Sequence, residues 1–557
     1  MAEAWGLSLP EEYRGIYAIL HPRYSDLPHP DEVFPPKGPS SSTSPRAFNL
    51  AEYLLDRNVA EGRGGKTCLH YESNRYTYAQ LLELSNRTAN ALKELGVGPE
   101  DRVLLVLPDS PEFAATWFGA LKAGAVFAMA NTLHPAEDYL YYLDYTKAPV
   151  AVVHASILDK FGPAAAEAKH LKAVLVVGAG SDSGRHLDFD RAVGRQSGRS
   201  APAGTTADDL AGWLFTSGST GRPKAAVHAH GDFLYNIERY ALQVVRYNED
   251  DLTVSVPKLF FGYATGTNLM FPFAAGGATA LFAERSTPER MFDVIERWRP
   301  TVLTSVPTTI NGMLSLPGCE RRDLESLRVC LSAGEALPPE LYRRWVDTFG
   351  VEILDGIGSA EMFHIYVSNR FGAVRPGSLG TLVPGYDARI VGPEGTDLPA
   401  GEQGTLWIRG GSTALCYWGD REKSRATFLG DWCVTGDQFT RDAEGYFSYG
   451  GRTDDMLKVS GIFVSPLEIE DCLTGHPAVR EACVTGAEDE GGLTKPKAWI
   501  ALRESHEGSE TLARELQEHV KARLSPYKYP RWVEFVAELP RTDRGKIDRR
   551  RLREGRA

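Results

Sequence analysis

The clearest periodic segment near the amino terminus has its less polar residues three and four positions apart, as on one face of an amphipathic helix. It opens with Thr77 and Gln80, which have the spacing of a capping box, and Gly96 follows its last turn. The periodic positions are Leu81, Leu84, Thr88, Leu92 and Leu95. The pattern predicts a helix that begins just after Thr77 and stops at Gly96.

Short apolar runs alternate with helical stretches through the first 355 residues. A run of this length is typical of a strand that is buried on both faces. The runs span residues 103–107, 125–130, 150–153, 173–177, 302–305, 329–332 and 351–354. Between the first two, Asp109, Ser110 and Pro111 supply the cap and first turn of a helix that we expect to end near Gly124. The alternation predicts an α/β fold with one or two mostly parallel sheets.

The pattern changes after about Thr381 to short strands separated by glycines, such as residues 404–408. This favours an antiparallel or barrel-like subdomain. The last hundred residues hold a strand-like run at 498–502, a helical pattern at about 511–524 and a basic tail. We expect two units. They are a large N-terminal domain of parallel α/β sheets with the barrel-like subdomain, residues 1–453, and a small α+β C-terminal domain, residues 454–557.

Composition narrows the class of protein. The chain has 557 residues, of which 43% are hydrophobic and 24% charged, so a folded protein with more than one domain is expected. The net charge of −12 argues against nucleic acid or an anionic membrane as a partner. The seven cysteines show no CxxC spacing, and we find neither a signal peptide nor an apolar stretch of membrane-spanning length. We therefore expect a soluble, cytoplasmic protein.

The segment 216–224 is the first candidate for chemistry. It follows an apolar strand at 213–215 and precedes a helix expected at about 232–245. Its residues are Thr216, Ser217, Gly218, Ser219, Thr220, Gly221, Arg222, Pro223 and Lys224. Glycines let backbone N–H groups approach an anion, hydroxyls add donors and Lys224 adds charge, which favours a phosphate-binding loop. It lacks the GK[ST] ending of a Walker motif, and a short Ser/Gly run by itself is more often a flexible surface loop.

Five further motifs carry a resemblance to a family. They are residues 332–335 (SAGE), 355–361 (DGIGSAE), 435–437 (TGD), 451–455 (GRTDD) and 540–546 (PRTDRGK). With the Ser/Thr/Gly loop, and in this order, they make the chain similar to the adenylate-forming superfamily of acyl- and aryl-CoA synthetases, luciferases and adenylation domains. The resemblance implies an enzyme that uses ATP and Mg²⁺ to adenylate a carboxylic acid and then transfers the acyl group to coenzyme A.

The resemblance also implies roles for individual residues. Lys546, Glu361 and Thr216 are expected to be catalytic, with Glu361 as the Mg²⁺ ligand, because a hard cation prefers oxygen donors. Asp454 is expected to be the hinge about which the mobile C-terminal domain rotates between the two half-reactions. The expected ATP- or AMP-binding residues are Thr216, Ser217, Gly218, Ser219, Thr220, Gly221, Lys224, Gly334, Glu335, Asp355, Gly356, Ile357, Asp437 and Arg452. Those expected to bind coenzyme A are Lys458, Ser460 and Gly461.

Two positions depart from the family pattern. The family usually has Thr in the place of Ala360, with its hydroxyl on phosphate, and Ser359 or the hydroxyls of residues 216–220 are the candidates to replace it. Ile357 stands where the family commonly has the Tyr that stacks on adenine. Altered nucleotide handling is the expected consequence.

Four segments are similar to benzoate-CoA ligases and their relatives that act on substituted benzoates, including 2-aminobenzoate: residues 51–59, 258–263, 355–364 and 455–461. An aryl pocket needs flat apolar walls with few polar groups. The residues expected to bind the aryl acid are Phe261, Tyr263, Gly358 and His364. Gly262 stands where relatives often have Ala, which weakly favours a ring substituent.

Two other functions stay open at this point. One is a stand-alone adenylation protein that loads an aryl acid onto a carrier protein instead of coenzyme A. The other is a weakened acid- or nucleotide-binding protein, which Ala360 favours and the retained Lys546, Glu361 and Asp437 disfavour. A monomer or a homodimer is expected.

Overall fold

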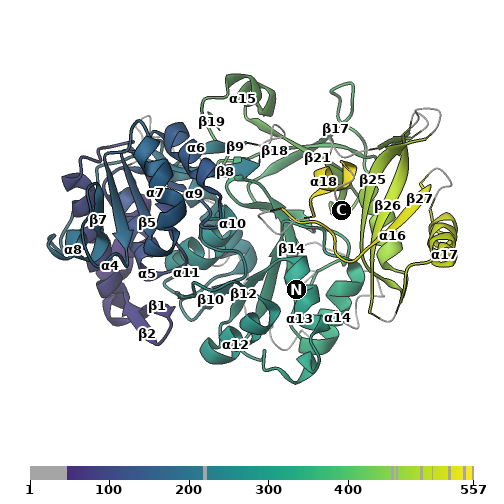
Figure 1. Cartoon of the computed structure of the whole chain (residues 1–557), viewed down its shortest axis with the longest axis horizontal. Helices are drawn as coiled ribbons and strands as arrows, with labels where there is room; N and C mark the ends of the chain where they lie inside the picture. Colours follow the sequence, from purple (N-terminus) through teal and green to yellow (C-terminus); the bar gives the residue numbers. More distant parts are fainter. Residues whose placement is uncertain are drawn as a thin grey trace.

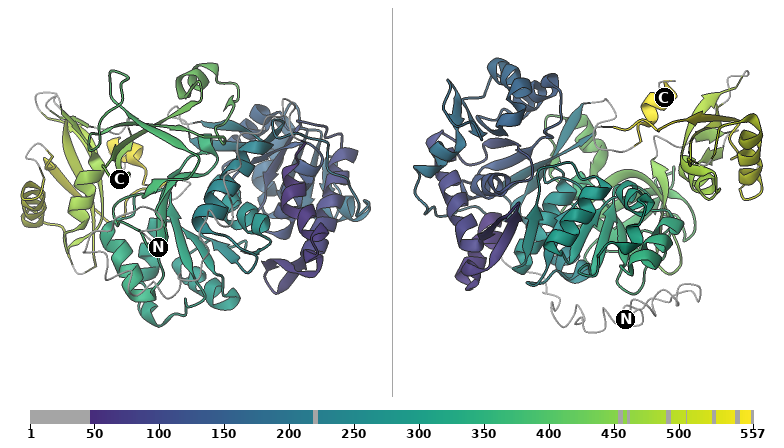
Figure 2. Two further views of the ribbon diagram at one scale, coloured as in Figure 1. Left: turned by 180° about the vertical axis from the view of Figure 1, so that it is seen from behind. Right: turned by 60° about the horizontal axis from the view of Figure 1, so that its bottom comes forward.

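The structure is a computed structural model that describes residues 47–217, 222–452, 457–459, 462–489, 494–504, 506–524, 528–542 and 547–554. Two large β-sheets lie beside each other, and the C-terminal region lies to one side of them (Figures 1 and 2).

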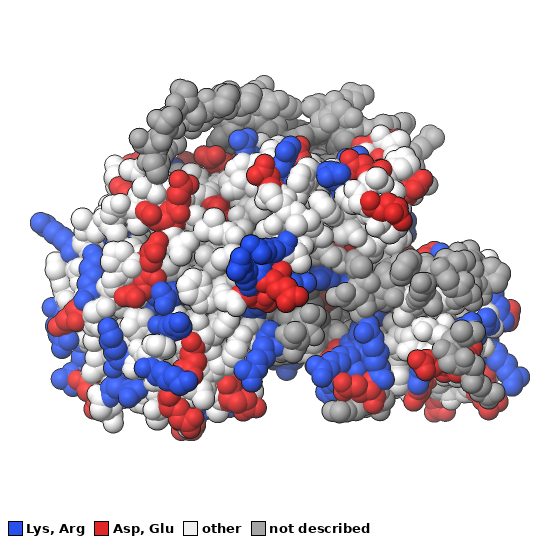
Figure 3. All heavy atoms as spheres, turned by 90° about the horizontal axis from the view of Figure 1, so that it is seen from above, with Lys and Arg blue, Asp and Glu red and all other residues white. Residues whose placement is uncertain are grey.

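Among the described residues, no helix combines the length and the apolar character needed to cross a membrane. Figure 3 shows Lys and Arg interspersed with Asp and Glu over the described part of this face.

The first large sheet has nine strands in the order β16-β15-β14-β13-β12-β10-β11-β1-β2. Its central strands, from β14 to β1, run parallel, and antiparallel strands close both edges. The strands are β1 (Thr67–Tyr71), β2 (Asn74–Thr77), β10 (Leu252–Ser255), β11 (Ala278–Leu281), β12 (Val302–Ser305), β13 (Val329–Ala333), β14 (Ile353–Gly358), β15 (Ile365–Ser368) and β16 (Thr381–Leu382).

The second large sheet has eight strands in the order β19-β9-β8-β4-β3-β5-β6-β7, parallel from β8 to β7. They are β3 (Arg102–Val106), β4 (Val126–Met129), β5 (Val150–His154), β6 (Ala173–Val177), β7 (His186–Asp188), β8 (Leu210–Ser217), β9 (Pro223–Ala229) and β19 (Cys416–Tyr417). Two mostly parallel sheets agree with the prediction from the apolar runs.

Helices pack around and between the two sheets (Figure 1). The α-helices of this part are α3 (Arg57–Ala60), α4 (Tyr78–Glu94), α5 (Pro111–Lys122), α6 (Ala136–Thr146), α7 (Leu158–Glu167), α8 (Phe189–Gly194), α9 (His230–Asn236), α10 (Gly262–Thr265), α11 (Phe271–Ala275), α12 (Pro288–Trp298), α13 (Pro307–Ser315), α14 (Pro339–Phe349) and α15 (Arg421–Thr427). The π-helical segments are η3 (Glu52–Asp56), η6 (Ile237–Val245) and η7 (Gly266–Met270), and the 3₁₀ turns are η4 (Arg63–Gly65), η5 (Ala155–Ile157), η8 (Cys319–Arg321) and η9 (Ala360–Met362). In α4, Thr77 and Gln80 make both bonds of the predicted capping box.

An antiparallel sheet of five strands follows in the chain, as the glycine-punctuated pattern predicts. Its strands are β17 (Asp387–Val391), β18 (Gly404–Arg409), β20 (Phe428–Leu429), β21 (Trp432–Arg441) and β22 (Phe447–Arg452). The predicted domain boundary at residues 453 and 454 lies outside the described residues.

The C-terminal region is α+β, and its larger sheet has three strands. Its elements are β23 (Leu457–Val459), β24 (Ile462–Val464), α16 (Pro466–Thr474), β25 (Val479–Glu488), β26 (Thr494–Leu502), α17 (Glu510–Lys521), β27 (Trp532–Val536) and α18 (Arg549–Arg553). It has its own buried cluster, in which Ile469, Val484, Ile500 and Leu516 pack together. A separate core is consistent with a unit that folds by itself.

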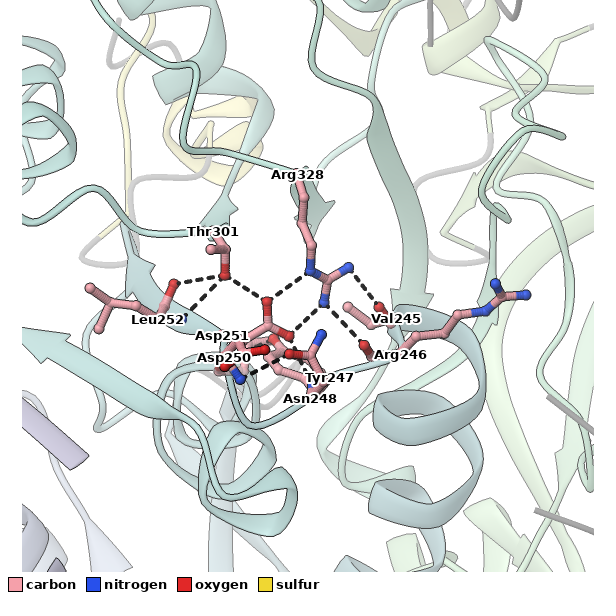
Figure 4. Close-up of polar contacts among 10 residues, drawn as sticks. Val245, Arg246, Tyr247, Asn248, Asp250, Asp251, Leu252, Thr301 and Arg328 are labelled. Atoms are coloured by element: carbon pink, nitrogen blue, oxygen red, sulfur yellow. Dashed lines mark hydrogen bonds and ion pairs between the residues drawn. The ribbon is translucent and has the colours of Figure 1, made fainter. Parts of the chain in front are cut away.

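The amino-terminal ends of three parallel strands are tied together by a buried polar cluster (Figure 4). Asp251, which directly precedes β10 and is 2% exposed, accepts two bonds from the Arg328 guanidinium, each 2.8 Å long. Thr301 donates to the same carboxylate over 2.6 Å, and Arg328 also donates to the Val245 carbonyl. Arg328 precedes β13 and Thr301 precedes β12, so the cluster fixes the ends of neighbouring strands.

Two local features differ from the sequence expectations. Residues 216–224 were expected to form one loop, but Thr216 lies in β8 and Lys224 in β9, paired directly across an antiparallel ladder. The helix expected at 232–245 is split into α9 and the π-helical η6. Both features depend on tertiary packing. The sequence expectations missed them because local periodicity does not indicate which strand will pair or where a π-helical turn will form.

Candidate active site

The predicted site residues of the nine-stranded sheet meet at one edge. Strands β10, β12, β13 and β14 run parallel, so the segments that follow their carboxyl ends lie along the same edge. These segments carry Phe261 and Tyr263 after β10, Thr308 after β12, Gly334 and Glu335 after β13, and Ser359 to Glu361 after β14. Thr308 donates to Glu335 from its backbone N–H over 3.2 Å and from its hydroxyl over 2.8 Å.

The predicted phosphate-binding segment lies on the neighbouring sheet. Gly218, Ser219, Thr220 and Gly221 lie outside the described residues, as does the side chain of Ser217, so their expected contacts remain predictions. Helix α6 contacts the start of β9, the strand that follows this segment. The Tyr141 hydroxyl donates to the Pro223 carbonyl over 2.6 Å, and the Arg222 guanidinium lies 5.2 Å from the centroid of the Tyr141 ring.

Glu361, the expected metal ligand, follows β14 of the first sheet and contacts β19 of the second. The Tyr417 hydroxyl donates to its Oε1 over 2.5 Å, and the Ala414 N–H donates to its backbone carbonyl over 2.8 Å. The Lys224 ammonium lies 3.6 Å from the centroid of the Tyr417 ring. Burial lowers the pKa of Lys224, and the neighbouring Glu361 carboxylate opposes that shift. The structure thus brings Lys224 and Glu361 together around one tyrosine that we did not predict.

The donors around Glu361 fit Mg²⁺. No group of three or more His, Cys, Asp or Glu side chains that could hold a metal ion occurs among the described residues. Mg²⁺ characteristically takes one or two protein carboxylates and fills its octahedron with phosphate oxygens and water. Glu361 supplies one such carboxylate beside Lys224, so it would hold the ion when the phosphates of a nucleotide supply further ligands.

Asp437 and Arg452, both expected to bind the nucleotide, are paired residues of β21 and β22. The Arg452 guanidinium donates to Asp437 Oδ1 over 3.0 Å. Asp437 is 6% exposed, and a buried carboxylate requires such a partner. The two residues therefore form one unit, as the resemblance implies.

Burial also determines the protonation state of Asp355, a residue of β14. It raises the pKa of Asp355 to about 8, so this side chain is mostly protonated at neutral pH. Gly356 and Gly358 are both needed for close packing, because an added Cβ would approach the Val367 carbonyl oxygen to 2.7 Å and the His364 carbonyl oxygen to 2.4 Å, respectively. Ile357 is partly buried.

His364 and Tyr263 lie against each other at the predicted aryl site. Their ring centroids are 5.3 Å apart, and the His364 Nε2 lies 3.0 Å from the Tyr263 carbonyl oxygen. Burial lowers the pKa of His364 to about 3, so the imidazole is neutral and Nε2 carries the proton that this carbonyl accepts. Nδ1 is then an acceptor. Among the described residues, neither this Nδ1 nor the Tyr263 hydroxyl has a hydrogen-bond partner, and both atoms are buried.

A buried pair behind η9 was also missed by sequence reasoning. The His228 Nε2 donates to the Ala360 carbonyl over 2.7 Å, and its Nδ1 lies 2.9 Å from Asp232 Oδ2. His228 is fully buried. The pair holds the backbone next to Glu361. No motif in the sequence signals it, because His228 lies 132 residues from Ala360.

Several predicted residues lie outside the described part of the chain. These are Lys546, Asp454, Ser460 and Gly461, together with the side chain of Lys458. The residues that flank the catalytic-lysine motif are described. Arg541 forms an antiparallel bridge with Ile547, and its guanidinium donates to the Thr308 hydroxyl over 3.3 Å. The segment next to Lys546 therefore contacts the same sheet edge.

Comparison with known proteins also indicates an adenylate-forming enzyme. Residues 55–418 match the AMP-binding enzyme family, and residues 468–546 match the AMP-binding enzyme C-terminal domain. The chain belongs to the AMP-binding enzyme family. This membership confirms the predicted adenylate-forming family, its fold and an enzymatic activity. It also fits the placement of Lys224, Glu361 and Asp437 around one site, although the individual roles of these residues remain predictions.

Three proteins are similar to this AMP-binding enzyme over nearly their whole length. The benzoate–CoA ligase of Thauera aromatica is 45% identical over 92% of this chain and 97% of its own. Among solved structures, an anthranilate CoA ligase in complex with anthranoyl-AMP is 39% identical with a TM-score of 0.88, covering 93% of this chain and 99% of its own. A benzoate CoA ligase from Burkholderia xenovorans LB400 is 42% identical with a TM-score of 0.84, covering 91% and 100%.

Proposed function

We propose that this protein is an ATP-dependent aryl-acid–CoA ligase. In the first half-reaction an oxygen of the aryl carboxylate attacks the α-phosphorus of ATP and displaces pyrophosphate. In the second, the thiol sulfur of coenzyme A attacks the carbonyl carbon of the aryl-adenylate and displaces AMP. The site supports this chemistry because Lys224 of β9, Glu361 after β14 and the Asp437–Arg452 pair of β21 and β22 lie near one another although they come from three sheets.

Each group has a distinct task in this proposal. Lys224 and the backbone of segment 216–221 bind phosphate, and Asp437 accepts hydrogen bonds from ribose hydroxyls. Glu361 holds Mg²⁺, which offsets negative charge on the phosphates. Lys546 offsets the charge that develops during adenylation. Rotation of the region after Asp454 then removes Lys546 and admits coenzyme A beside Lys458, Ser460 and Gly461.

The preferred acid is a benzoate with a hydrogen-bonding ring substituent. The observation that supports this choice is the buried Tyr263 hydroxyl and His364 Nδ1, which lack partners among the described residues. A buried polar atom without a partner is costly, and a substrate hydroxyl or amino group would satisfy it. Among the relatives, those named for 3-hydroxybenzoate, 4-hydroxybenzoate and anthranilate act on benzoates with such a substituent, whereas the Thauera aromatica ligase is named for benzoate itself. 2-Aminobenzoate is one acid of this class.

A substrate panel tests the proposal. Benzoate, 2-aminobenzoate, 3- and 4-hydroxybenzoate and a medium-chain fatty acid are compared by pyrophosphate release and by the mass of the thioester formed with coenzyme A or with a purified carrier protein. We expect a substituted benzoate to have the highest kcat/KM, with coenzyme A as acceptor. Faster turnover of the fatty acid would refute the aryl assignment. Thioester on the carrier alone would refute coenzyme A.

The variant Tyr263→Phe tests whether the Tyr263 hydroxyl recognises the ring substituent of the acid or only supports binding of the ring. It should lower kcat/KM for the preferred substituted acid by about two- to tenfold, the effect of one neutral hydrogen bond. Benzoate serves as the internal control, because it has no ring group for the hydroxyl to bind, and its kcat/KM should stay the same or rise. An equal loss for both acids would mean that the hydroxyl only supports the local packing.

A further inference from the structure

Tyr417 is a buried residue that touches two charged groups of the site without being one of the predicted residues. It is 4% exposed and lies in β19, which pairs with β9 so that Tyr417 is opposite Ala226. Its hydroxyl donates to Glu361 Oε1 over 2.5 Å, and the face of its ring lies 3.6 Å from the Lys224 ammonium. One side chain therefore connects the expected metal ligand with the expected phosphate-binding lysine.

The backbone of Tyr417 is fixed by its surroundings. Its N–H donates to the Ser424 hydroxyl oxygen over 2.9 Å, and the Tyr145 hydroxyl donates to the carbonyl of the next residue, Trp418, over 2.5 Å. The Phe428 ring packs against the Tyr417 ring with centroids 5.3 Å apart. A side chain held in this way can position a flexible partner at little entropic cost, because its own freedom is already lost.

We propose that Tyr417 is the positioning residue of the metal and phosphate end of the site. This inference rests on the proposed function, in which Glu361 holds Mg²⁺. By binding Oε1, the hydroxyl would restrict the Glu361 carboxylate and leave its Oε2 as the oxygen to bind the ion. By attracting the ammonium group, the ring face keeps Lys224 within reach of the same phosphates. The two effects are separable, since the hydroxyl acts on Glu361 and the ring on Lys224.

Two variants distinguish the effect of the hydroxyl on Glu361 from the effect of the ring on Lys224. Tyr417→Phe removes the hydroxyl and keeps the ring, so of the two charged groups it should disturb Glu361 and not Lys224, while it also removes the contact of the hydroxyl with Thr427. Tyr417→Leu removes both, so it should also weaken phosphate binding by Lys224. The matched control is Tyr446→Phe. Tyr446 is likewise buried, at 3% exposed, donates its hydroxyl to the Ala373 carbonyl, and has the Arg375 guanidinium 3.6 Å from its ring centroid, but none of the predicted site residues is among these contacts.

The readout is ATP binding by calorimetry at a series of Mg²⁺ concentrations, with no organic acid present. Tyr417→Phe should raise the Mg²⁺ concentration for half-maximal ATP binding by about tenfold, as expected for loss of one hydrogen bond to a charged group. Tyr417→Leu should in addition weaken ATP binding in EDTA. Tyr446→Phe should change neither. An unchanged Mg²⁺ dependence in Tyr417→Phe would overturn the inference.

A double-variant cycle guards against a loss of folding. If the hydroxyl acts through Glu361, Tyr417→Phe should have no further effect on Mg²⁺ dependence in a Glu361→Gln background. Additive effects would overturn the inference, because the tyrosine would then act on the fold. Failure of the proposed function has a different signature. The wild-type protein would bind ATP with the same Mg²⁺ and Tyr417 dependence but release no pyrophosphate with any aryl acid.

Discussion

Glu352 is a buried carboxyl group that should make the protein less stable as the pH rises. The residue directly precedes β14 and is fully buried, and both of its carboxyl oxygens lie 3.3 Å from a single donor, the Gly372 N–H. Burial raises its pKa from 4.5 to about 8. Because this pKa is raised in the folded state, the group binds a proton on folding between about pH 4.5 and pH 8, and stability falls across that window.

The size of the effect follows from the shift. A difference of about 3.5 pKa units, from 4.5 to about 8, corresponds to about 5 kcal/mol at pH 8 and above, and to almost nothing below pH 4.5. The variant Glu352→Gln is neutral at every pH, so it removes this penalty. Among the described residues, the side-chain amide of the variant would have only the Gly372 N–H as a hydrogen-bond partner, so its NH₂ group would be buried unpaired. This costs about 1–3 kcal/mol of stability. We therefore expect the variant to gain about 2–4 kcal/mol at pH 8 and to be no more stable than the wild type at pH 5.

Thermal unfolding of both proteins from pH 5 to pH 9 measures this difference. The variant should melt at a higher temperature than the wild type at pH 8, and the gap should close toward pH 5. Glu507→Gln, an exposed glutamate in the loop before α17, is the control and should leave the pH profile unchanged. A gap of the same size at pH 5 and pH 8 would refute the reasoning, because it would show that ionisation of Glu352 plays no part.

Three more predictions test the catalytic lysine, the strand-end cluster and a glycine. Lys546→Ala should abolish most pyrophosphate release yet leave thioester formation from a supplied aryl-adenylate largely intact, whereas equal loss of both would contradict the rotating domain. Asp251→Asn leaves Arg328 buried without its carboxylate and should cost about 3–5 kcal/mol in denaturant unfolding, with a smaller loss when Arg328→Met is added. Gly358→Ala should lower both the melting temperature and kcat/KM, because its Cβ would come within 2.4 Å of the His364 carbonyl oxygen and displace that backbone at the aryl site; a variant as stable and as active as the wild type would contradict this placement.

Elements with a strong local signal could be predicted from the sequence. The run at 173–177 became β6 with the same bounds, because a continuous apolar run suits a strand buried on both faces. The helix capped by Thr77 is present with both bonds of its capping box. The motifs identified the family for a related reason, since glycines, hydroxyls and charges at fixed spacing are local features of the chain.

Contacts between distant segments were decided by the tertiary structure alone. Tyr417 meets Glu361 across 56 residues because β19 joins the edge strand β9 of one sheet beside η9 of the other. His228 reaches the Ala360 carbonyl in the same way, and Lys224 lies in a strand that the sequence did not indicate. Periodicity reports which residues are buried, but not which strand lies next to them. Sheet order and register supply that information, and both arise from the packing of the whole chain.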